Sequence, residues 1–270
     1  MSFTFCMDKL ILLSFDVEEF DVPEEYGQTL PESVKFKVSA EGLDKVLQLL
    51  DRLNIRATFF ITANFAIHHP STILEIAKKH EVASHGFYHA SFCVEDLARS
   101  KQALEEITHQ EVAGFRMARL QPVSDREIQQ AGYRYNSSMN PTYLPGRYNN
   151  LSKPRIPYHS DRLLNIPVSV TPFIRFPLFW LSFKNLPLPL YKLASRITLN
   201  WDSYINLYFH PWEFTNIRGY QLPGYIKTRS GREMLDRLEN YLRWVSAICT
   251  FATFSEFQAK LDSGSLFKLL

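Results

Sequence analysis

Cysteine is scarce in this chain of 270 residues. The three cysteines, Cys6, Cys93 and Cys249, are odd in number and widely separated. This pattern excludes a disulfide framework and a zinc ribbon, and it favours a reducing compartment. An excess of charge of one sign is also lacking, because 30 basic residues face 28 acidic ones and leave a net charge of +2. With no basic run either, nucleic acid is not an expected partner.

Long hydrophobic runs are absent as well. A membrane-spanning helix needs ~20 consecutive apolar residues, and the nearest candidate, 172–190, is broken by prolines, Arg175 and Lys184. Residues 1–15 lack the basic start and the small-residue cleavage site of a signal peptide. We therefore expect a cytoplasmic protein. The apolar, arginine-bearing stretch 171–190 leaves three options open, which are peripheral contact with a membrane, a hydrophobic lid and barrel packing.

The composition is that of an ordinary globular protein, with 46% hydrophobic and 21% charged residues. A chain of this length can bury a substantial core. The sequence shows no internal repeat and no low-complexity linker. We expect a single catalytic domain over residues 1–270, with an irregular insertion rich in proline and aromatic residues at about 141–200.

Short apolar runs alternate with amphipathic segments, which is typical of an α/β domain with a mostly parallel sheet. The strands are expected at 9–15, 55–62, 81–84, 112–116, 133–135, 163–170, 204–209 and 250–254. The helices are expected at 40–53, from 72, at 93–108, and after 124, 230 and 255. The expected start signals are Ser39 and the capping-box pairs Thr72–Glu75, Ser124–Glu127, Ser230–Glu233 and Ser255–Gln258.

Polar residues follow four of these strands. An acidic cluster begins at Asp16, and His85, Arg116 and His210 each come just after an apolar run. In barrels of parallel strands the active site collects at the carboxyl ends of the strands. The four signals therefore point to one face of the molecule.

Two of them form a candidate metal site. Asp16 and Glu18 project to the same side of an extended strand and Glu19 to the other. His85 and His89 are four residues apart and Gly86 permits a tight turn between them. Two imidazoles and one carboxylate hold a divalent cation with open positions for water and substrate. Each motif alone is weak evidence, and Glu19 is a rival to Glu18 as the ligand.

Arg116 and His210 complete the candidate site. Arg116 ends an apolar strand, where it either extends to the rim or pairs with Asp16 and holds it ionised. His210 is followed by Pro211 and titrates near neutrality, which suits an acid that protonates an amine leaving group. Asp202 and Glu213 are the nearby acids that could orient it.

Taken together, these motifs resemble the polysaccharide deacetylase family, the carbohydrate esterases that share the NodB homology domain. The ordered matches are Ser14–Glu18, His85–His89, Gly114–Arg116, Tyr133–Ser138 and Tyr208–Pro211. Asp16-Val17-Glu18 is similar to the Asp-Val-Glu branch of the family, where a glutamate takes the more usual aspartate slot. Two departures are Ala118, where a proline is usual, and Asn136, where an aspartate is usual.

The resemblance implies a distorted (β/α) barrel, usually of seven strands, and a divalent metal, commonly Zn²⁺. It implies removal of an N-acyl group, usually N-acetyl, from an amino sugar of a polysaccharide, a cell-envelope glycan or a lipid-linked glycan precursor. In the implied mechanism Asp16 is the catalytic base, Arg116 orients it and His210 is the general acid. The implied metal ligands are Glu18, His85 and His89. The implied substrate contacts are Tyr88, Trp212 and the backbone N–H near Leu120.

Three other functions remain as alternatives. Relatives of this barrel act on small cyclic amides, so an amidohydrolase of allantoin or purine type is one of them. A catalytically inactive carbohydrate-binding barrel is another, although the intact set of Asp16, His85, His89 and His210 argues against it. A structural zinc protein is disfavoured because no cysteine lies near the histidine pair.

Overall fold

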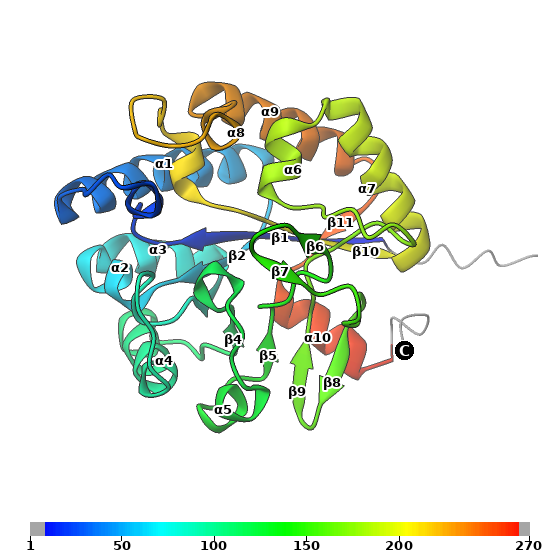
Figure 1. Ribbon diagram of the computed structural model, residues 1–270. Coiled ribbons are helices and arrows are strands. Elements are labelled where there is room, and N and C mark those ends of the chain that lie inside the picture. The colour runs from blue at the N-terminus through cyan, green and yellow to red at the C-terminus, as the bar shows by residue number, and fades with distance from the viewer. Residues whose placement is uncertain (1–8, 265–270) are drawn as a thin grey trace, which may run out of the picture.

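The protein was analysed as a computed structural model that describes residues 9–264, so Cys6 and most of the N-terminal segment lie outside the described residues. Seven parallel strands form a curled sheet in the order β10-β1-β2-β3-β4-β5-β9 (Figure 1). Their bounds are β1 Leu10–Val17, β2 Thr58–Ile61, β3 Glu81–Ser84, β4 Gly114–Phe115, β5 Tyr135–Asn136, β9 Leu163–Asn165 and β10 Tyr204–Phe209. The expected distorted (β/α) barrel is confirmed.

Within residues 9–264, four short strands complete the β-structure. The strand β8 (Tyr158–Ser160) pairs antiparallel with β9, and β11 (Thr250–Phe251) runs parallel to the start of β1. The strands β6 (Tyr143–Leu144) and β7 (Tyr148–Asn149) form a separate hairpin. Between β9 and β10 the barrel is joined by a loop instead of a strand ladder, because the Ser169 N–H donates to the Asn206 carbonyl at 3.1 Å.

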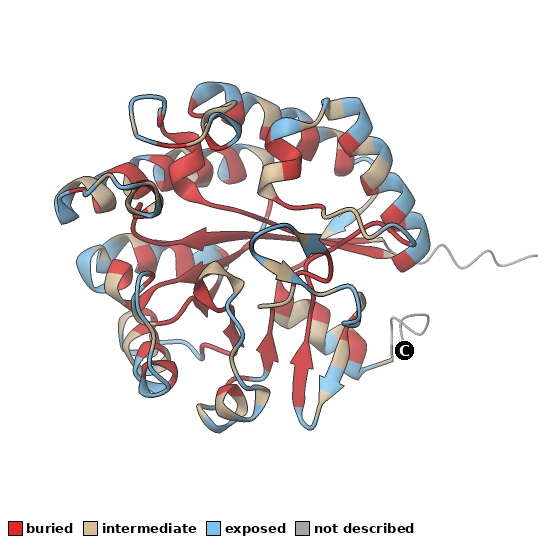
Figure 2. Cartoon of the chain, viewed as in Figure 1, coloured by how far each residue is buried: buried red, intermediate tan, exposed pale blue. Residues whose placement is uncertain are grey.

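Helices surround the sheet, and their exposed faces point outward while the seven parallel strands are almost entirely buried (Figure 2). The α-helices are α1 Glu32–Leu53, α2 Ala63–His68, α3 Pro70–Lys79, α4 Glu95–Thr108, α5 Asp125–Gln130, α6 Trp180–Asn185, α7 Leu188–Asp202, α8 Gly224–Lys227, α9 Arg232–Val245 and α10 Phe254–Asp262. Three 3₁₀ turns are η1 Val22–Tyr26, η2 Ala118–Leu120 and η3 Pro211–Phe214. No helix among residues 9–264 has the length and apolar character to cross a membrane.

The alternation of β1 separates two cores. Ile11, Leu13, Phe15 and Val17 pack outward in the cluster that also contains apolar residues of the covering helices. Leu10 and Leu12 belong instead to the interior cluster, together with Phe254 and Phe257 of α10. Because successive side chains of a strand face opposite sides, Ser14 and Asp16 continue the interior row. The row therefore changes from apolar to polar toward the carboxyl end of β1.

Several predicted helix starts are wrong. The helix expected from 40 begins at Glu32, and Ser39 is buried within it. Thr72 lies inside α3, which begins at Pro70. Ser124 does occupy the N-cap of α5, but its hydroxyl makes no capping hydrogen bond. Each of these local signals gave way to the packing of the helix as a whole.

The last two starts are also displaced. The helix expected from Ser230 begins at Arg232. The terminal helix is capped by Thr253 and Glu256, because the Ser255 hydroxyl donates to Glu81 of β3 instead. Within the expected insertion, only 163–165 of the predicted strand 163–170 is a strand, and two helices, α6 and α7, were not anticipated.

Candidate active site

The end of β1 places two carboxylates inside the barrel and turns the third away. Asp16 and Glu18 are each 2% exposed and line the same cavity. Glu19 instead accepts hydrogen bonds from the Thr62 hydroxyl at 3.0 Å and from the Asn64 side chain. The choice left open by the sequence is therefore settled in favour of Glu18 as the carboxylate beside the histidines.

Glu18, His85 and His89 form a buried cluster with one ligand atom each, all within 4.8 Å of one another. Glu18 Oε2 lies 3.1 Å from His85 Nε2 and 3.0 Å from His89 Nε2. The opposite nitrogens are held by other groups, His85 Nδ1 by the Arg116 carbonyl at 2.9 Å and His89 Nδ1 by Asp21 Oδ1 at 2.7 Å. Such outer contacts fix the rings of metal-binding histidines. This donor set fits a divalent cation such as Zn²⁺.

Trp212 anchors the carboxylate of this cluster. Its indole N–H donates to Glu18 Oε1 at 3.0 Å, so the two oxygens of Glu18 serve different partners. Trp212 is only 1% exposed. The residue lines the cavity, as expected of a substrate contact, but its polar atom is committed to Glu18.

The charges of the cluster are strongly coupled. Burial alone would raise the pKa of Glu18, but His89 and His210, together with hydrogen bonds from the histidines, hold this pKa well below its ordinary value. Burial alone would lower the pKa of His89, but Glu18 and Asp21 raise it to about 10. The buried carboxylates are therefore stabilised by a positive charge at this point, and a bound divalent cation would supply such a charge.

Arg116 fixes the position of the Asp16 carboxylate. Its Nη1 donates to Asp16 Oδ1 at 2.6 Å and to the Ser14 hydroxyl at 2.9 Å. Its other nitrogens donate to the backbone oxygen and the hydroxyl of Ser137, and its guanidinium carbon lies 4.0 Å from the centre of the Phe60 ring. Arg116 is 0% exposed. It does not extend to the rim, and the pairing with Asp16 is the arrangement found.

His210 is oriented by Glu213 and not by Asp202. Glu213 Oε1 accepts the His210 backbone N–H at 2.9 Å and lies 3.2 Å from His210 Nδ1. Burial would lower the pKa of His210, but Glu18, Glu213 and Asp16 raise it above its ordinary value. Asp202 instead forms an ion pair with Arg155 at 2.6 Å.

The sheet places the acid and base candidates side by side. In the parallel ladder of β1 and β10, Phe15 is aligned with Phe209. Asp16 is the next residue of β1, and His210 directly follows β10. Neighbouring strands lie ~4.8 Å apart, so the backbone register itself brings these side chains to adjacent positions.

One cavity of about 110 Å³ collects these groups, with Asp16, Glu18, His85, His89 and His210 in its wall. Other lining residues come from the β6–β7 hairpin and the start of α6: Leu144, Arg147, Tyr148, Phe179 and Trp180.

Two predicted substrate contacts are not arranged as expected. Leu120 lines the cavity, but its backbone N–H donates to the Met117 carbonyl at 3.0 Å and is already engaged. Tyr88 is 40% exposed and lines a separate depression beside Glu19 and Lys35. Its neighbours His85 and His89 turn inward, whereas the Tyr88 side chain does not.

Three functional neighbours were missed by the sequence reasoning. Asp21 lies in the acidic stretch after β1 and Ser137 lies in the Tyr133–Ser138 motif, so both belong to segments that the sequence had marked as candidate site segments. Lys184 had no local signal. It is 0% exposed, and its Nζ lies 3.3 Å from Glu213 Oε2.

The fold and the site define a class, namely barrels with a two-histidine, one-carboxylate cluster at the carboxyl ends of the strands. The family model described as polysaccharide deacetylase matches residues 8–136, which include Asp16, the metal-site candidates and Arg116. Over these residues the chain is similar to the polysaccharide deacetylase family.

Solved structures agree on the fold. A protein from Mycobacterium smegmatis assigned as a polysaccharide deacetylase has a TM-score of 0.66 at 20% identity, covering 98% of this chain and 94% of its own. The Puue allantoinase has a TM-score of 0.65 at 15% identity, covering 93% and 89%. A protein from Pseudomonas aeruginosa PAO1, also assigned as a polysaccharide deacetylase, has a TM-score of 0.64 at 16% identity, covering 91% and 88%. No curated protein sequence matches this chain.

Proposed function

We propose that this protein is a metal-dependent N-deacetylase that acts on an amino sugar of a polysaccharide, a cell-envelope glycan or a lipid-linked glycan precursor. The single observation that carries the proposal is the convergence of three units at one cavity, with Arg116 and Glu213 buried behind the residues of its wall. The three units are the Glu18–His85–His89 cluster, the Asp16–Arg116 pair and the His210–Glu213 pair. The family match supports the reaction class.

Glu18, His85 and His89 would hold the metal, with Zn²⁺ favoured by the mixed nitrogen and oxygen ligands. When bound, such an ion lowers the pKa of water and polarises a carbonyl group. The chain's own contribution is to present the two imidazole Nε2 atoms and one carboxylate oxygen inward. Asp21 and the Arg116 carbonyl keep both rings in that orientation.

Asp16 serves as the general base. The buried guanidinium of Arg116 donates to its carboxylate at 2.6 Å and fixes the orientation of that carboxylate. In this role Asp16 takes a proton from the water molecule that attacks the acyl carbon.

His210 serves as the general acid on the other side of the same cavity. Its pKa is raised above the ordinary value by Glu18, Glu213 and Asp16, which favours the protonated ring that a general acid needs. From that state it gives its proton to the amine nitrogen as the carbon–nitrogen bond breaks. Glu213 holds the ring so that Nε2 is the nitrogen free to face the substrate.

The test is acetate release from N-acetylated amino-sugar oligosaccharides by chelated protein to which zinc or cobalt is restored. Asp16→Asn is expected to lower kcat about 10²–10⁴-fold while metal content is retained. Asp51→Asn, an exposed carboxylate paired with Lys79, is the matched control and is expected to keep full activity. Activity without metal, or full activity of Asp16→Asn, contradicts the mechanism.

A parallel assay with allantoin tests the second candidate function, an amidohydrolase acting on cyclic amides. The structural similarity to the Puue allantoinase supports testing it. Metal-dependent opening of allantoin without acetate release from sugars would assign the chain to cyclic amides. Substoichiometric metal without either activity would favour a catalytically inactive carbohydrate-binding barrel.

A further inference from the structure

Helix α7 carries an unusually apolar outer surface. Leu190, Leu193, Ile197 and Trp201 recur at helical spacing and are 54%, 55%, 45% and 61% exposed. The loop before α6 adds Phe173 and Ile174, both 79% exposed. These six residues are called the α7 apolar face below. Single exposed hydrophobic residues are ordinary, but a grouped set of this size marks an interaction surface.

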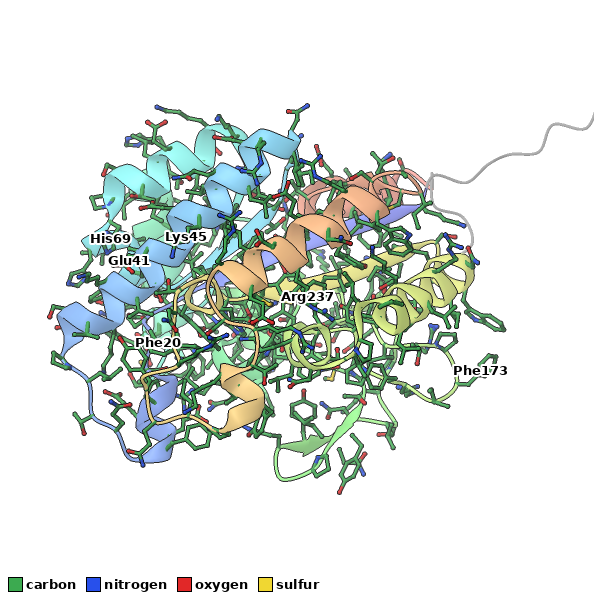
Figure 3. The ribbon with its side chains drawn as sticks, turned by 90° about the horizontal axis from the view of Figure 1, so that it is seen from above. Phe20, Glu41, Lys45, His69, Phe173 and Arg237 are labelled. Carbon is green, nitrogen blue, oxygen red and sulfur yellow. The ribbon has the colours of Figure 1, made fainter. Side chains whose placement is uncertain are left out.

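The loop residues are part of the same surface. The Phe173 and Trp201 rings meet edge to face with their centres 4.8 Å apart. The loop is closed by hydrogen bonds from the Thr171 N–H to the Phe176 carbonyl and from the Phe176 N–H to the Thr171 hydroxyl. Figure 3 shows Phe173 projecting outward at the edge of the molecule. The loop is therefore held in a conformation that presents apolar side chains to solvent.

The backbone of the loop supports this interpretation. Phe173 has a φ of 65°, in the left-handed region that bulky residues rarely occupy. A small polar residue would suit both this backbone and this exposure better. Phe173 contacts Trp201 but remains 79% exposed, so most of its apolar surface is left for a contact outside the chain.

Charge indicates what the contact is. The 40 residues from Arg162 to Trp201 contain no aspartate or glutamate, and besides the buried, paired Lys184 they include four basic residues, Arg162, Arg175, Lys192 and Arg196. Arg196 is exposed on α7 itself. The one acid of the helix, Asp202, is buried and neutralised by a bidentate pair with Arg155.

We propose that the α7 apolar face docks onto the surface of an anionic lipid bilayer. Amphipathic helices with apolar and basic residues lie in the interface of such membranes, where aromatic rings sit at headgroup level. Basic residues are attracted to anionic lipids. A second copy of the chain fits less well, because a two-fold contact through this face brings cationic groups of both copies together.

The proposal stands apart from the deacetylase function, since none of the six residues lines the catalytic cavity. Vesicle binding can therefore succeed or fail independently of acetate release. Activity on a soluble substrate is expected to be the same in variants of the face.

The experiment is co-sedimentation of the purified full chain with vesicles of phosphatidylcholine alone or mixed with phosphatidylglycerol. The chain is expected to bind the mixed vesicles, less at high salt because screening weakens the attraction. The double variant Phe173→Asn/Ile174→Ser is expected to bind about tenfold more weakly. Arg196→Glu tests the charge and is expected to weaken binding to the mixed vesicles only.

The matched control is Ile67→Ser, a 51% exposed isoleucine on α2, which is expected to bind as the parent does. Circular dichroism and activity on the soluble substrate verify that each variant is folded. Absence of vesicle binding overturns the proposal, as does equal binding by the parent and the Phe173/Ile174 variant. A concentration-dependent dimer that this double variant abolishes, seen by analytical ultracentrifugation without lipid binding, assigns the face to self-association instead.

Discussion

Lys184 and Glu213 form an ion pair, Nζ to Oε2 at 3.3 Å, in which both side chains are 0% exposed. The other oxygen of Glu213 faces His210, so Glu213 lies between the lysine and the proposed acid. The Lys184 ammonium also donates to the Ile226 carbonyl at 3.0 Å. Burial lowers the pKa of this lysine, and Glu213 opposes that effect.

Lys184→Met leaves Glu213 charged and without its cation in the interior. Breaking one side of a buried pair costs roughly 3–5 kcal/mol of unfolding free energy, measured by denaturant titration. The double variant Lys184→Met/Glu213→Gln removes both charges, and we expect it to regain most of that loss. Lys78→Met, which removes an exposed pair with Glu75, is the control and costs less than about 1 kcal/mol. Equal effects of the two single variants would contradict a buried pair.

Metal content tests the cluster directly. After incubation with zinc and removal of excess, the parent chain is expected to hold about one ion per molecule. His85→Ala and His89→Ala are each expected to lose most of it, since two ligands remain. His159→Ala removes an exposed histidine of β8 and should leave the content unchanged. Zinc should also raise the Tm of the parent and of His159→Ala but not of the ligand variants.

Gly42 allows α1 to approach the turn after His210. A Cβ atom added at Gly42 would lie 1.8 Å from the Pro211 carbonyl oxygen, too close for two non-bonded atoms. Gly42→Ala is expected to cost about 1–3 kcal/mol by overpacking and to lower kcat by displacing the backbone beside His210. Gly219→Ala meets nothing within 4 Å and serves as the control. A shift in Tm with unchanged kcat would show that the displacement does not reach His210.

His80 predicts an acid-dependent loss of stability. Burial lowers its pKa to about 4 from the ordinary 6.5, and its Nδ1 accepts the Ala57 N–H, which requires the unprotonated ring. Between these pH values the unfolded chain binds more protons, so the unfolding free energy falls as the pH drops from about 6.5 to 4. His80→Asn keeps an acceptor without a titrating group and should flatten this part of the profile by about 1–2 kcal/mol, allowing for partial solvent screening.

The control for that profile is His68→Asn, an exposed histidine of α2, which should keep the slope of the parent. Denaturant titrations at several pH values measure both variants. Parallel profiles for His80→Asn and the parent would show that another group is responsible.

Much of the sheet could be predicted because its strands are continuous apolar runs. The predicted bounds of β3 and β10 coincide with those observed. The sequence also placed Asp16, His85 and His210 at the carboxyl ends of strands, and the structure brings the three to one cavity because parallel strands end at one edge. These features depend on local pattern and on one topological rule.

What could not be predicted depends on partners distant in sequence. Lys184 reaches Glu213 only after α6 packs beside η3, and no local pattern marks it. The sequence predicts Ser255 as a helix cap, but in the fold its hydroxyl donates a hydrogen bond to Glu81 of β3. Tyr88 lies between two inward-facing histidines, but the turn at Gly86 directs its side chain elsewhere. In each case tertiary contacts decide, and a single sequence does not display them.

The position of β1 between β2 and β10 has a consequence for biosynthesis. By the time residue 136 has been made, β1 has β2 along the carboxyl half of one edge, but the edge that receives β10 is bare until residue 209. An unpaired edge is a template for association with other chains. The nascent protein thus carries its proposed metal ligands early and its proposed proton donor late. Shielding of the β1 edge and completion of the catalytic set are expected to be a single late event of folding, because His210 directly follows β10.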